Sequence, residues 1–189
     1  MVGAVKIQAI KKLCNEMGIY YLYDCENGLQ YLGDGRACWP VEGIHLSADM
    51  IPALFDISEK KQEDTIIKAW PCPDEERFSL VPVTGEEGLK DLGPIYHSGE
   101  YIRVLSGQDG LIFINSELTK PGANKEGRFL YSLRKREGRT PIVACYGDMM
   151  VSALVMPIKG RGIMERLEKL SSYPLNVFWD EGEENQHGE

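Results

Sequence analysis

Hydrophobic positions near the start of the chain recur at intervals of three and four residues. Ile7, Ile10 and Cys14 follow this spacing, and charged residues lie between them. Apolar residues at such intervals form one stripe along an α-helix. The pattern predicts an amphipathic helix over residues 4–17 that ends at Gly18, because glycine readily adopts the left-handed conformation of a helix C-cap.

Three pairs of apolar segments rich in β-branched and aromatic residues are each separated by a short turn sequence. The turns contain Asn27-Gly28, Asp109-Gly110 and Gly147-Asp148. Asn, Asp and Gly accept the positive φ angles of tight hairpin turns, so the sequence predicts three β-hairpins. Their strands are residues 19–24 with 29–34, 100–106 with 111–116, and 141–146 with 149–157.

Shorter elements are expected between the hairpins. They include an extended segment that Pro40 ends, a short helix capped by Ser47 with Pro52 in its first turn, and a strand at 65–71. Farther along, the pattern predicts a strand from residue 78 followed by a loop or short helix, a loop over 118–127, a strand or short helix over 128–141, and an amphipathic helix over 163–170.

These elements predict an α+β fold of antiparallel β-hairpins with two or three short amphipathic helices. The prolines and charges of residues 71–77 are typical of a linker. We therefore expect an N-terminal α+β half at 1–73, a C-terminal α+β half at 78–179 and an acidic disordered tail at 180–189.

The two halves could be similar to each other. Asn27-Gly28 and Asp109-Gly110 lie 82 positions apart, and a leucine follows each turn. An internal duplication would produce this alignment. Hairpins of unrelated origin would produce it as well, because their turns require the same residue types.

The composition is that of an ordinary globular protein, with 43% hydrophobic and 26% charged residues. No apolar run approaches the roughly 20 residues that a membrane-spanning helix needs. Lysines interrupt the apolar residues at the N-terminus, which is unlike a signal peptide. We therefore expect a cytoplasmic protein without membrane association.

The cysteines are isolated in the sequence and form no C-x-x-C pair. They are Cys14, Cys25, Cys38, Cys72 and Cys145. Structural zinc sites use closely spaced ligand pairs, and disulfides are rare in reducing compartments. We therefore expect free thiols, mostly buried, with no metal and no cofactor.

Basic residues concentrate in one segment of an acidic chain. The chain has 21 Lys and Arg residues against 29 Asp and Glu, a net charge of −8, yet residues 120–139 contain seven basic and two acidic residues. Arginines form forked contacts with phosphate, although a solvated loop would have the same composition. The candidate nucleic-acid or anion-binding residues are Arg128, Arg134, Lys135, Arg136 and Arg139.

Aromatic side chains provide candidate stacking faces. Alternation along the strand at 19–24 places Tyr21 and Tyr23 on one face and Tyr20 on the other. Tyr131 directly precedes the basic cluster. Aromatic rings can stack on nucleic-acid bases, so Tyr21, Tyr23 and Tyr131 are candidates for this role, and packing in the core is the alternative.

No motif indicates catalysis. Gly33-Asp34-Gly35 lacks the Lys and hydroxyl of a phosphate-binding Walker loop, and Trp39-Pro40 would prevent the helix that a dinucleotide site requires. We therefore interpret it as a turn. Neither His45 nor His97 lies in a nucleophile signature. A Cys–His hydrolase is thus a third alternative, and we expect a protein that is not an enzyme.

Two segments resemble known families. The stretch VSALVMPIK, which contains Met156, Pro157 and Ile158, resembles the closing strand of bacterial DNA sliding clamps, and the helix-then-hairpin halves are similar too. The segment YLGDGRACWPVEGIHLSADMIPALFDI resembles small uncharacterised proteins of Gram-positive phages and mobile elements, which are often found in replication modules. A further helix and an acidic tail follow the clamp-like strand in this chain, and a bacterial clamp has neither of them.

Two functions follow as expectations. The first is a non-enzymatic phage or mobile-element accessory protein, most concretely a clamp-like replication or DNA-associated factor. The second is a viral anti-defence protein that inhibits a host defence protein or sequesters a small anionic, nucleotide-type ligand. In that case the aromatic strands and the basic loop would form its pocket. We expect DNA or a replication or defence protein as the partner, and a homo-oligomer.

Overall fold

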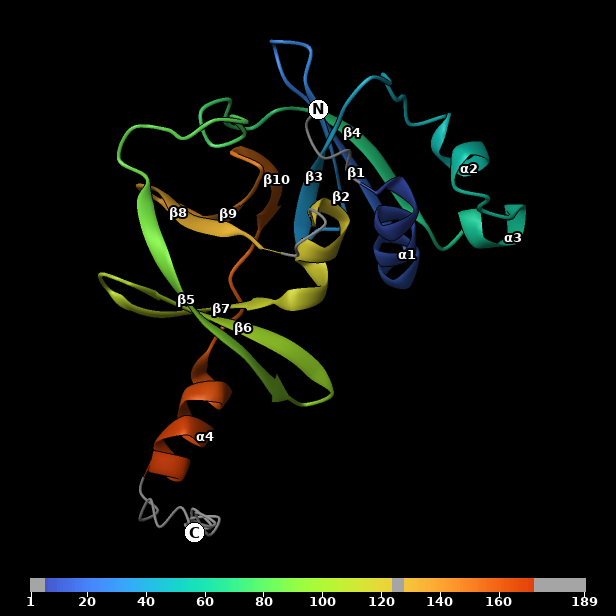
Figure 1. The fold of residues 1–189 in the computed structure, drawn as a ribbon. Coiled ribbons are helices and arrows are strands. Elements are labelled where there is room, and N and C mark those ends of the chain that lie inside the picture. Colours follow the sequence, from blue (N-terminus) through green and yellow to red (C-terminus); the bar gives the residue numbers. More distant parts are fainter. Residues whose placement is uncertain (1–5, 124–127, 172–189) are drawn as a thin grey trace, which may run out of the picture. The chain divides into compact units, whose positions relative to one another are not determined.

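The computed structural model describes residues 6–123 and 128–171 and shows an α+β fold (Figure 1). The chain divides between Lys159 and Gly160 into two compact units. The first unit contains all the strands of the described residues, and the second contains the helix α4 (Arg161–Ser171). The predicted fold class, mostly antiparallel strands with a few short helices, is confirmed.

Ten strands form one sheet in the order β4-β1-β2-β3-β10-β9-β8-β5-β6-β7. The pairing of β1 with β4 is parallel, and the other pairings are antiparallel. The strands are β1 (Ile19–Asp24), β2 (Gln30–Gly33), β3 (Ala37–Val41), β4 (Ile66–Pro71), β5 (Glu87–His97), β6 (Glu100–Gly107), β7 (Gly110–Asn115), β8 (Leu130–Arg136), β9 (Arg139–Gly147) and β10 (Met150–Val155). All three predicted hairpins are present, as β1–β2, β6–β7 and β9–β10.

The helices of the first unit are short. They are α1 (Ile7–Met17), α2 (Ile51–Leu54), α3 (Glu59–Gln62) and the 3₁₀-helix η1 (Ser116–Gly122). Gly18 ends α1 as predicted, with φ 65° and its N–H donating to the Cys14 carbonyl. Ser47 does not cap α2, because Met50 holds the N-cap position, whereas Pro52 does lie in the first turn. The loop predicted over 118–127 overlaps η1. This short 3₁₀-helix contains Pro121, which it tolerates.

Two strands differ from the sequence prediction. Pro40 lies inside β3 rather than at its end, because the strand continues to Val41. Residues 78–86 form no strand, although the sequence predicted one from residue 78, and the loop or short helix expected after it is instead β5, whose first residues pair with β8 and whose remainder pairs with β6. A register shift between Asp91 and Gly93, where Gly93 has φ 94°, lets one strand join both partners.

Apolar side chains pack on both faces of the sheet. On one face, α1 and η1 cover Tyr20 and Trp39, and the Trp39 indole N–H donates to the Leu118 carbonyl at 2.9 Å. On the other face, the Tyr31 hydroxyl donates to the Phe78 carbonyl at 2.6 Å. The segment that follows β4 therefore covers the sheet face opposite α1.

Strands from both predicted halves belong to the same sheet, since β3 pairs with β10 at its centre. Two similar clamp-like halves are not confirmed: the Asn27-Gly28 turn leads into the inner strand β2, whereas the Asp109-Gly110 turn leads into the edge strand β7. The predicted boundary at 73–78 stays a prediction, and the tail at 180–189 lies outside the described residues. No helix within 6–123 or 128–171 is long and apolar enough to cross a membrane.

Candidate functional site

A pocket of 320 Å³ lies beside the apolar cluster that contains Tyr31 and Cys38. Small-molecule sites occupy about 300–1,000 Å³, so this pocket is large enough for a small ligand. Residues from distant parts of the sequence line it: Tyr23 of β1, Gly35 and Arg36 of the β2–β3 turn, Ala37 and Cys38 of β3, Pro73, Asp74, Arg77 and Phe78 after β4, Arg139, Thr140 and Ile142 of β9, and Leu154 and Met156 at the end of β10.

Three arginines line this pocket. Arg36 is paired with the buried Asp34 at 2.6 Å. No carboxylate of the described chain lies within ion-pair distance of Arg77 or Arg139. Burial and the neighbouring guanidinium groups, including that of Arg139, lower the pKa of Arg77, although Asp74 opposes this shift. This wall of the pocket therefore carries positive charge that an anion would stabilise.

Two buried polar atoms of pocket-lining residues have no hydrogen-bond partner in the described structure. They are Asp74 Oδ2 and Arg77 Nε. The other carboxylate oxygen of Asp74 pairs with Arg136 at 2.6 Å. A buried polar atom without a partner destabilises a protein by about 1–3 kcal/mol, so such atoms mark places where a ligand or water completes the bonding.

Aromatic rings form the apolar part of the pocket. The rings of Tyr23 and Phe78 lie 5.3 Å apart, and both residues line the pocket. Tyr21 lies on the same strand face and packs on Trp70 at 4.8 Å. Tyr131 is only 4% exposed, packs in the core and lines a different depression, so it does not contribute to this pocket. Two of the three predicted stacking residues therefore lie in or near the pocket.

Arg134 is not an anion-binding residue at the surface, contrary to the sequence-based expectation, because its side chain is only 1% exposed. Its Nε donates to Glu86 at 3.0 Å, and one Nη donates to the Arg77 and Ser79 carbonyls at 2.7 and 2.8 Å. The other Nη donates to the Val81 carbonyl and to a tyrosine hydroxyl. All five donors are therefore occupied, and Arg134 holds residues 77–81 against the sheet.

The carboxylate opposite Arg134 is held in its charged form. Burial raises the pKa of Glu86, but hydrogen bonds from the Ser132 and Tyr146 hydroxyls, together with the Arg134 charge, outweigh this effect and lower it. Arg134 and Glu86 thus form a buried ion pair with further hydrogen bonds, which is the arrangement that buried charges require.

The remaining predicted basic residues are separated from one another. Lys135 pairs with Glu87 and Asp109 at 2.7 and 2.6 Å, away from the pocket. Arg136 reaches the pocket only through its ion pair with Asp74. Arg128 lines a separate depression, where it has interactions of its own. Of the five predicted residues, only Arg139 lines the pocket directly.

The glycine-rich turn Gly33-Asp34-Gly35 is a chain reversal, as predicted, and it also contributes to the pocket. Asp34 Oδ1 accepts from the Arg36 and Ala37 N–H groups, both at 2.9 Å, which closes the turn between β2 and β3. Its other oxygen accepts from the Arg36 guanidinium. The turn therefore presents Arg36 to the pocket rather than wrapping a phosphate in its own backbone.

A second depression is larger but chemically different. It measures 850 Å³ and is lined by the turn at Asn27 and by residues 79–84. Glu75 and Glu76 also line it, and its lining includes no Lys or Arg. Because carboxylates repel anions, the smaller, arginine-lined pocket is the better candidate for an anionic ligand.

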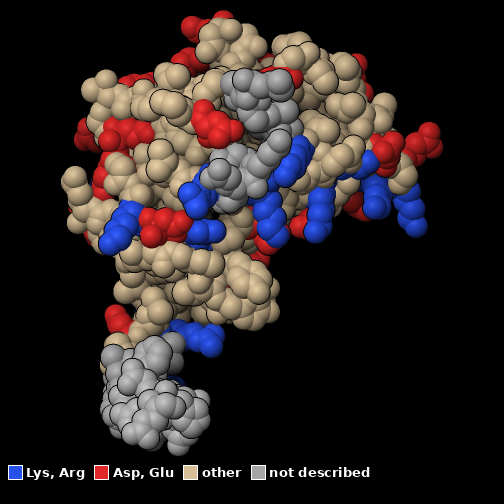
Figure 2. Space-filling view, viewed as in Figure 1, with Lys and Arg blue, Asp and Glu red and all other residues tan. Residues whose placement is uncertain are grey.

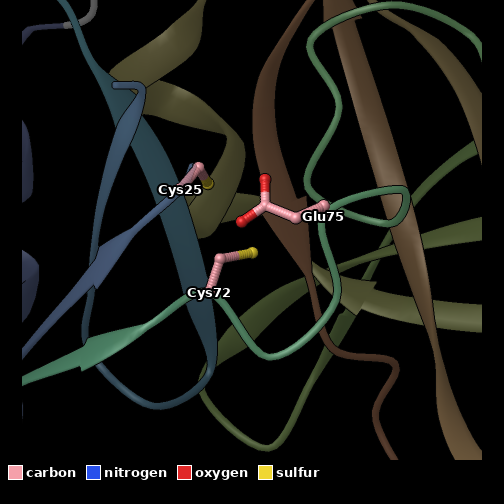
Figure 3. Close-up of side chains that lie close together, drawn as sticks. All are labelled: Cys25, Cys72 and Glu75. Carbon is pink, nitrogen blue, oxygen red and sulfur yellow. The ribbon is translucent and has the colours of Figure 1, made fainter. Parts of the chain in front are cut away.

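One cluster of side chains has the composition of a metal site. The sulfur atoms of Cys25 and Cys72 and a carboxylate oxygen of Glu75 all lie within 4.8 Å of one another (Figure 3). Sequence spacing did not indicate this cluster, because 47 positions separate the two cysteines. The prediction of free thiols, mostly buried, is confirmed for all five cysteines.

Arg77 and Arg36 line the pocket but were not among the residues predicted from the sequence. Arg77 lies in the segment that its prolines and charges marked as a linker, and Arg36 follows a turn. The only available signal was an arginine beside each of two turn sequences, which is common on any protein surface.

No protein-family model, no curated protein and no solved structure matches the chain.

Proposed function

We propose that the protein binds a small anionic ligand that carries a flat ring, of the nucleotide type, in the arginine-lined pocket. The observation that carries this proposal is the combination of two arginines without carboxylate partners, two unsatisfied polar atoms and two aromatic rings around 320 Å³. It corresponds to the second of the two expectations from the sequence, in which an aromatic strand and the basic loop form one pocket.

Each part of the pocket suits one part of such a ligand. Arg139 provides forked N–H donors for a phosphate or carboxylate, and Arg77 adds its unpaired Nε–H, since one of its Nη groups already donates to the Thr140 carbonyl. Tyr23 and Phe78 provide apolar ring surfaces for a base or similar ring. Asp74 provides an unpaired acceptor for an amino or hydroxyl group of the ligand. The proposed role is capture, with no reacting group assigned.

Arg134 supports this pocket without contacting the ligand. Its bonds to the carbonyls of Arg77, Ser79 and Val81 fix the backbone that carries Arg77 and Phe78. Because this backbone is fixed, the pocket arginine needs little ordering on binding, and less of the binding free energy is lost to entropy.

A thermal-shift panel tests the proposal. The panel contains nucleoside mono- and diphosphates, the corresponding uncharged nucleosides, and inorganic phosphate. A ligand at 100 times its dissociation constant adds about 2.7 kcal/mol, which raises the melting temperature of a chain of this size by about 5–10 °C. We expect the nucleotides to stabilise the protein more than either the nucleosides or phosphate alone.

Variants decide whether the binding occurs in this pocket. Arg77→Gln and Arg139→Gln should reduce the shift, whereas Arg161→Gln, on the exposed surface of α4, should leave it unchanged. The proposal fails if no member of the panel stabilises the protein, or if the pocket variants respond like the wild type.

A nucleic-acid interface is the second candidate, supported by a different surface. Figure 2 shows Lys and Arg side chains in a band over η1, α1 and α3. Helix α1 carries Lys12 and α3 carries Lys60 and Lys61, but neighbouring carboxylates pair with Lys11, Lys12 and Lys120. DNA binding that weakens steeply between about 50 and 200 mM salt, and that weakens further in Lys60→Gln/Lys61→Gln, would support this candidate. No binding at either salt concentration would exclude it.

A further inference from the structure

The parallel pairing of β1 with β4 brings two cysteines together at the carboxyl ends of these strands. Asp24 lies opposite Pro71 in the register, and Cys25 and Cys72 are the next residues along each strand. The Cys72 N–H donates to the Asp24 carbonyl at 2.7 Å, which continues the ladder by one bond. Adjacent parallel strands lie about 4.8 Å apart, so the two thiols are held side by side.

The β1–β2 turn and the segment after β4 hold this pair in place. The Cys25 N–H donates to the Leu29 carbonyl at 2.9 Å, and the Cys25 carbonyl accepts from Gly28 at 3.0 Å. Glu75 lies three residues beyond Cys72, and its carboxylate accepts from the Glu26 N–H at 3.0 Å. These bonds turn the carboxylate toward the two sulfur atoms, as Figure 3 shows.

We propose that Cys25, Cys72 and Glu75 bind a thiophilic divalent cation, with Zn²⁺ as the expected metal. Zinc sites use thiolate ligands at about 2.3 Å and carboxylate ligands at about 2.0–2.2 Å, and three ligand atoms already within 4.8 Å of one another can close on one ion with small side-chain rotations. Calcium and magnesium prefer oxygen ligands, so two sulfur atoms exclude them.

The degree of burial predicts an open fourth position. Cys25 is buried, Cys72 is half-buried and Glu75 is exposed, so the ion would be covered on the side of the sheet and open toward solvent. A water molecule would complete the tetrahedron. A thiol ordinarily titrates at about pH 8.5, so at neutral pH each cysteine gives up one proton when it binds a metal.

Binding exchanges the two thiol protons for the metal ion. Both S–H bonds break, two Zn–S bonds and one Zn–O bond form, and two protons pass to solvent, with no change of oxidation state. The bound ion would connect β1 to the first turn of the segment after β4. That segment continues into Asp74 and Phe78 of the pocket, so the metal would also stiffen one wall of the pocket.

Cobalt substitution tests the site directly. Co²⁺ is titrated into the reduced full chain, kept under a non-thiol reductant, and followed by absorption. We expect one Co²⁺ per chain, a thiolate-to-cobalt charge-transfer band and the strong visible bands of tetrahedral cobalt, all of which disappear when Zn²⁺ displaces the cobalt. Absence of these bands, or bands of octahedral cobalt without thiolate, overturns the proposal.

Three ligand variants, one control variant and a proton-release measurement on the wild type test the site, so the result does not depend on any single variant. Cys25→Ala and Cys72→Ala should remove the charge-transfer band, and Glu75→Gln should weaken binding, whereas the neighbouring Glu76→Gln should bind like the wild type. If a cysteine variant fails to fold, the wild type still decides: Zn²⁺ should release two protons per ion in weak buffer. Release of fewer than two, or an unchanged band in a folded cysteine variant, overturns the proposal.

Discussion

Replacement of Arg134 by methionine should destabilise the protein strongly. The side chain is 1% exposed, and its partner Glu86 is 7% exposed at the side chain. In Arg134→Met, the carboxylate stays buried without its cation, and the carbonyls of residues 77, 79 and 81 lose their donors. The change therefore combines an unpaired buried charge with unsatisfied backbone groups.

The magnitude follows from these contacts. Removal of one partner from a buried ion pair lowers the free energy of unfolding by about 3–5 kcal/mol. For a chain of this length, each kcal/mol changes the melting temperature by about 2–4 °C, so we expect a decrease of about 6–20 °C. Arg134→Lys should also destabilise the protein, because a single ammonium has three donors and cannot serve five bonds.

Urea unfolding followed by far-UV circular dichroism measures the effect, and Lys135→Met is the matched control. Lys135 lies on the same strand but is 46% exposed, and exposed ion pairs contribute about 0.2–1 kcal/mol. The double variant Arg134→Met/Glu86→Leu should lose less than the sum of its single changes, because it removes both charges. If Arg134→Met is no less stable than Lys135→Met, the structural role assigned to Arg134 is wrong.

Three further predictions concern local features of the fold. Gly33→Ala should lower the free energy of unfolding by about 1–3 kcal/mol, because its Cβ would lie 2.6 Å from the Ala37 carbonyl oxygen, whereas Gly88→Ala, with no atom within 4 Å, should change it by less than about 0.5 kcal/mol. An alkylating reagent should label Cys72 first under native conditions, since the other thiols are buried; mass mapping that finds a buried thiol labelled first would contradict this. The pKa of Glu86 is lowered from 4.5 in the folded protein, so its charge stabilises the fold above that pH and this contribution is lost as the pH falls through the folded pKa. Urea unfolding at several pH values should therefore show a smaller difference in the free energy of unfolding between the wild type and Glu86→Gln below about pH 4.5. A difference that stays constant with pH would refute this role of the Glu86 charge.

Local patterns in the sequence were sufficient for most secondary structure. The apolar spacing from Ile7 to Cys14 and the hairpin turns at Asn27-Gly28 and Asp109-Gly110 act over a few residues, and the structure confirms each element. The long strand β5 was missed because it is largely exposed and contains Gly93, so it shows little hydrophobic alternation. Its pairing with two partners depends on distant strands, which no local pattern specifies.

The candidate site shows the same limit more clearly. The concentration of charge around Arg134 lies in a segment that reaches the pocket at Arg139, but the sequence could not show which arginines of this segment are buried. Whether a side chain is buried depends on the sheet that forms around it, and Arg134 and Arg139 differ only in that respect. Likewise, Cys25 and Cys72 meet only because β1 and β4 pair in parallel.

Isothermal titration calorimetry tests the central claim most directly. The nucleotide that stabilises the protein most is titrated into the wild type, Arg77→Gln, Arg139→Gln and the control Arg161→Gln. A hydrogen bond to a charged group contributes about 1.5–3 kcal/mol, so each pocket variant should bind about 10–100-fold more weakly, while the control should bind like the wild type. Equal affinity in the pocket variants and the wild type, or no heat of binding for any nucleotide, would contradict the assignment of this pocket.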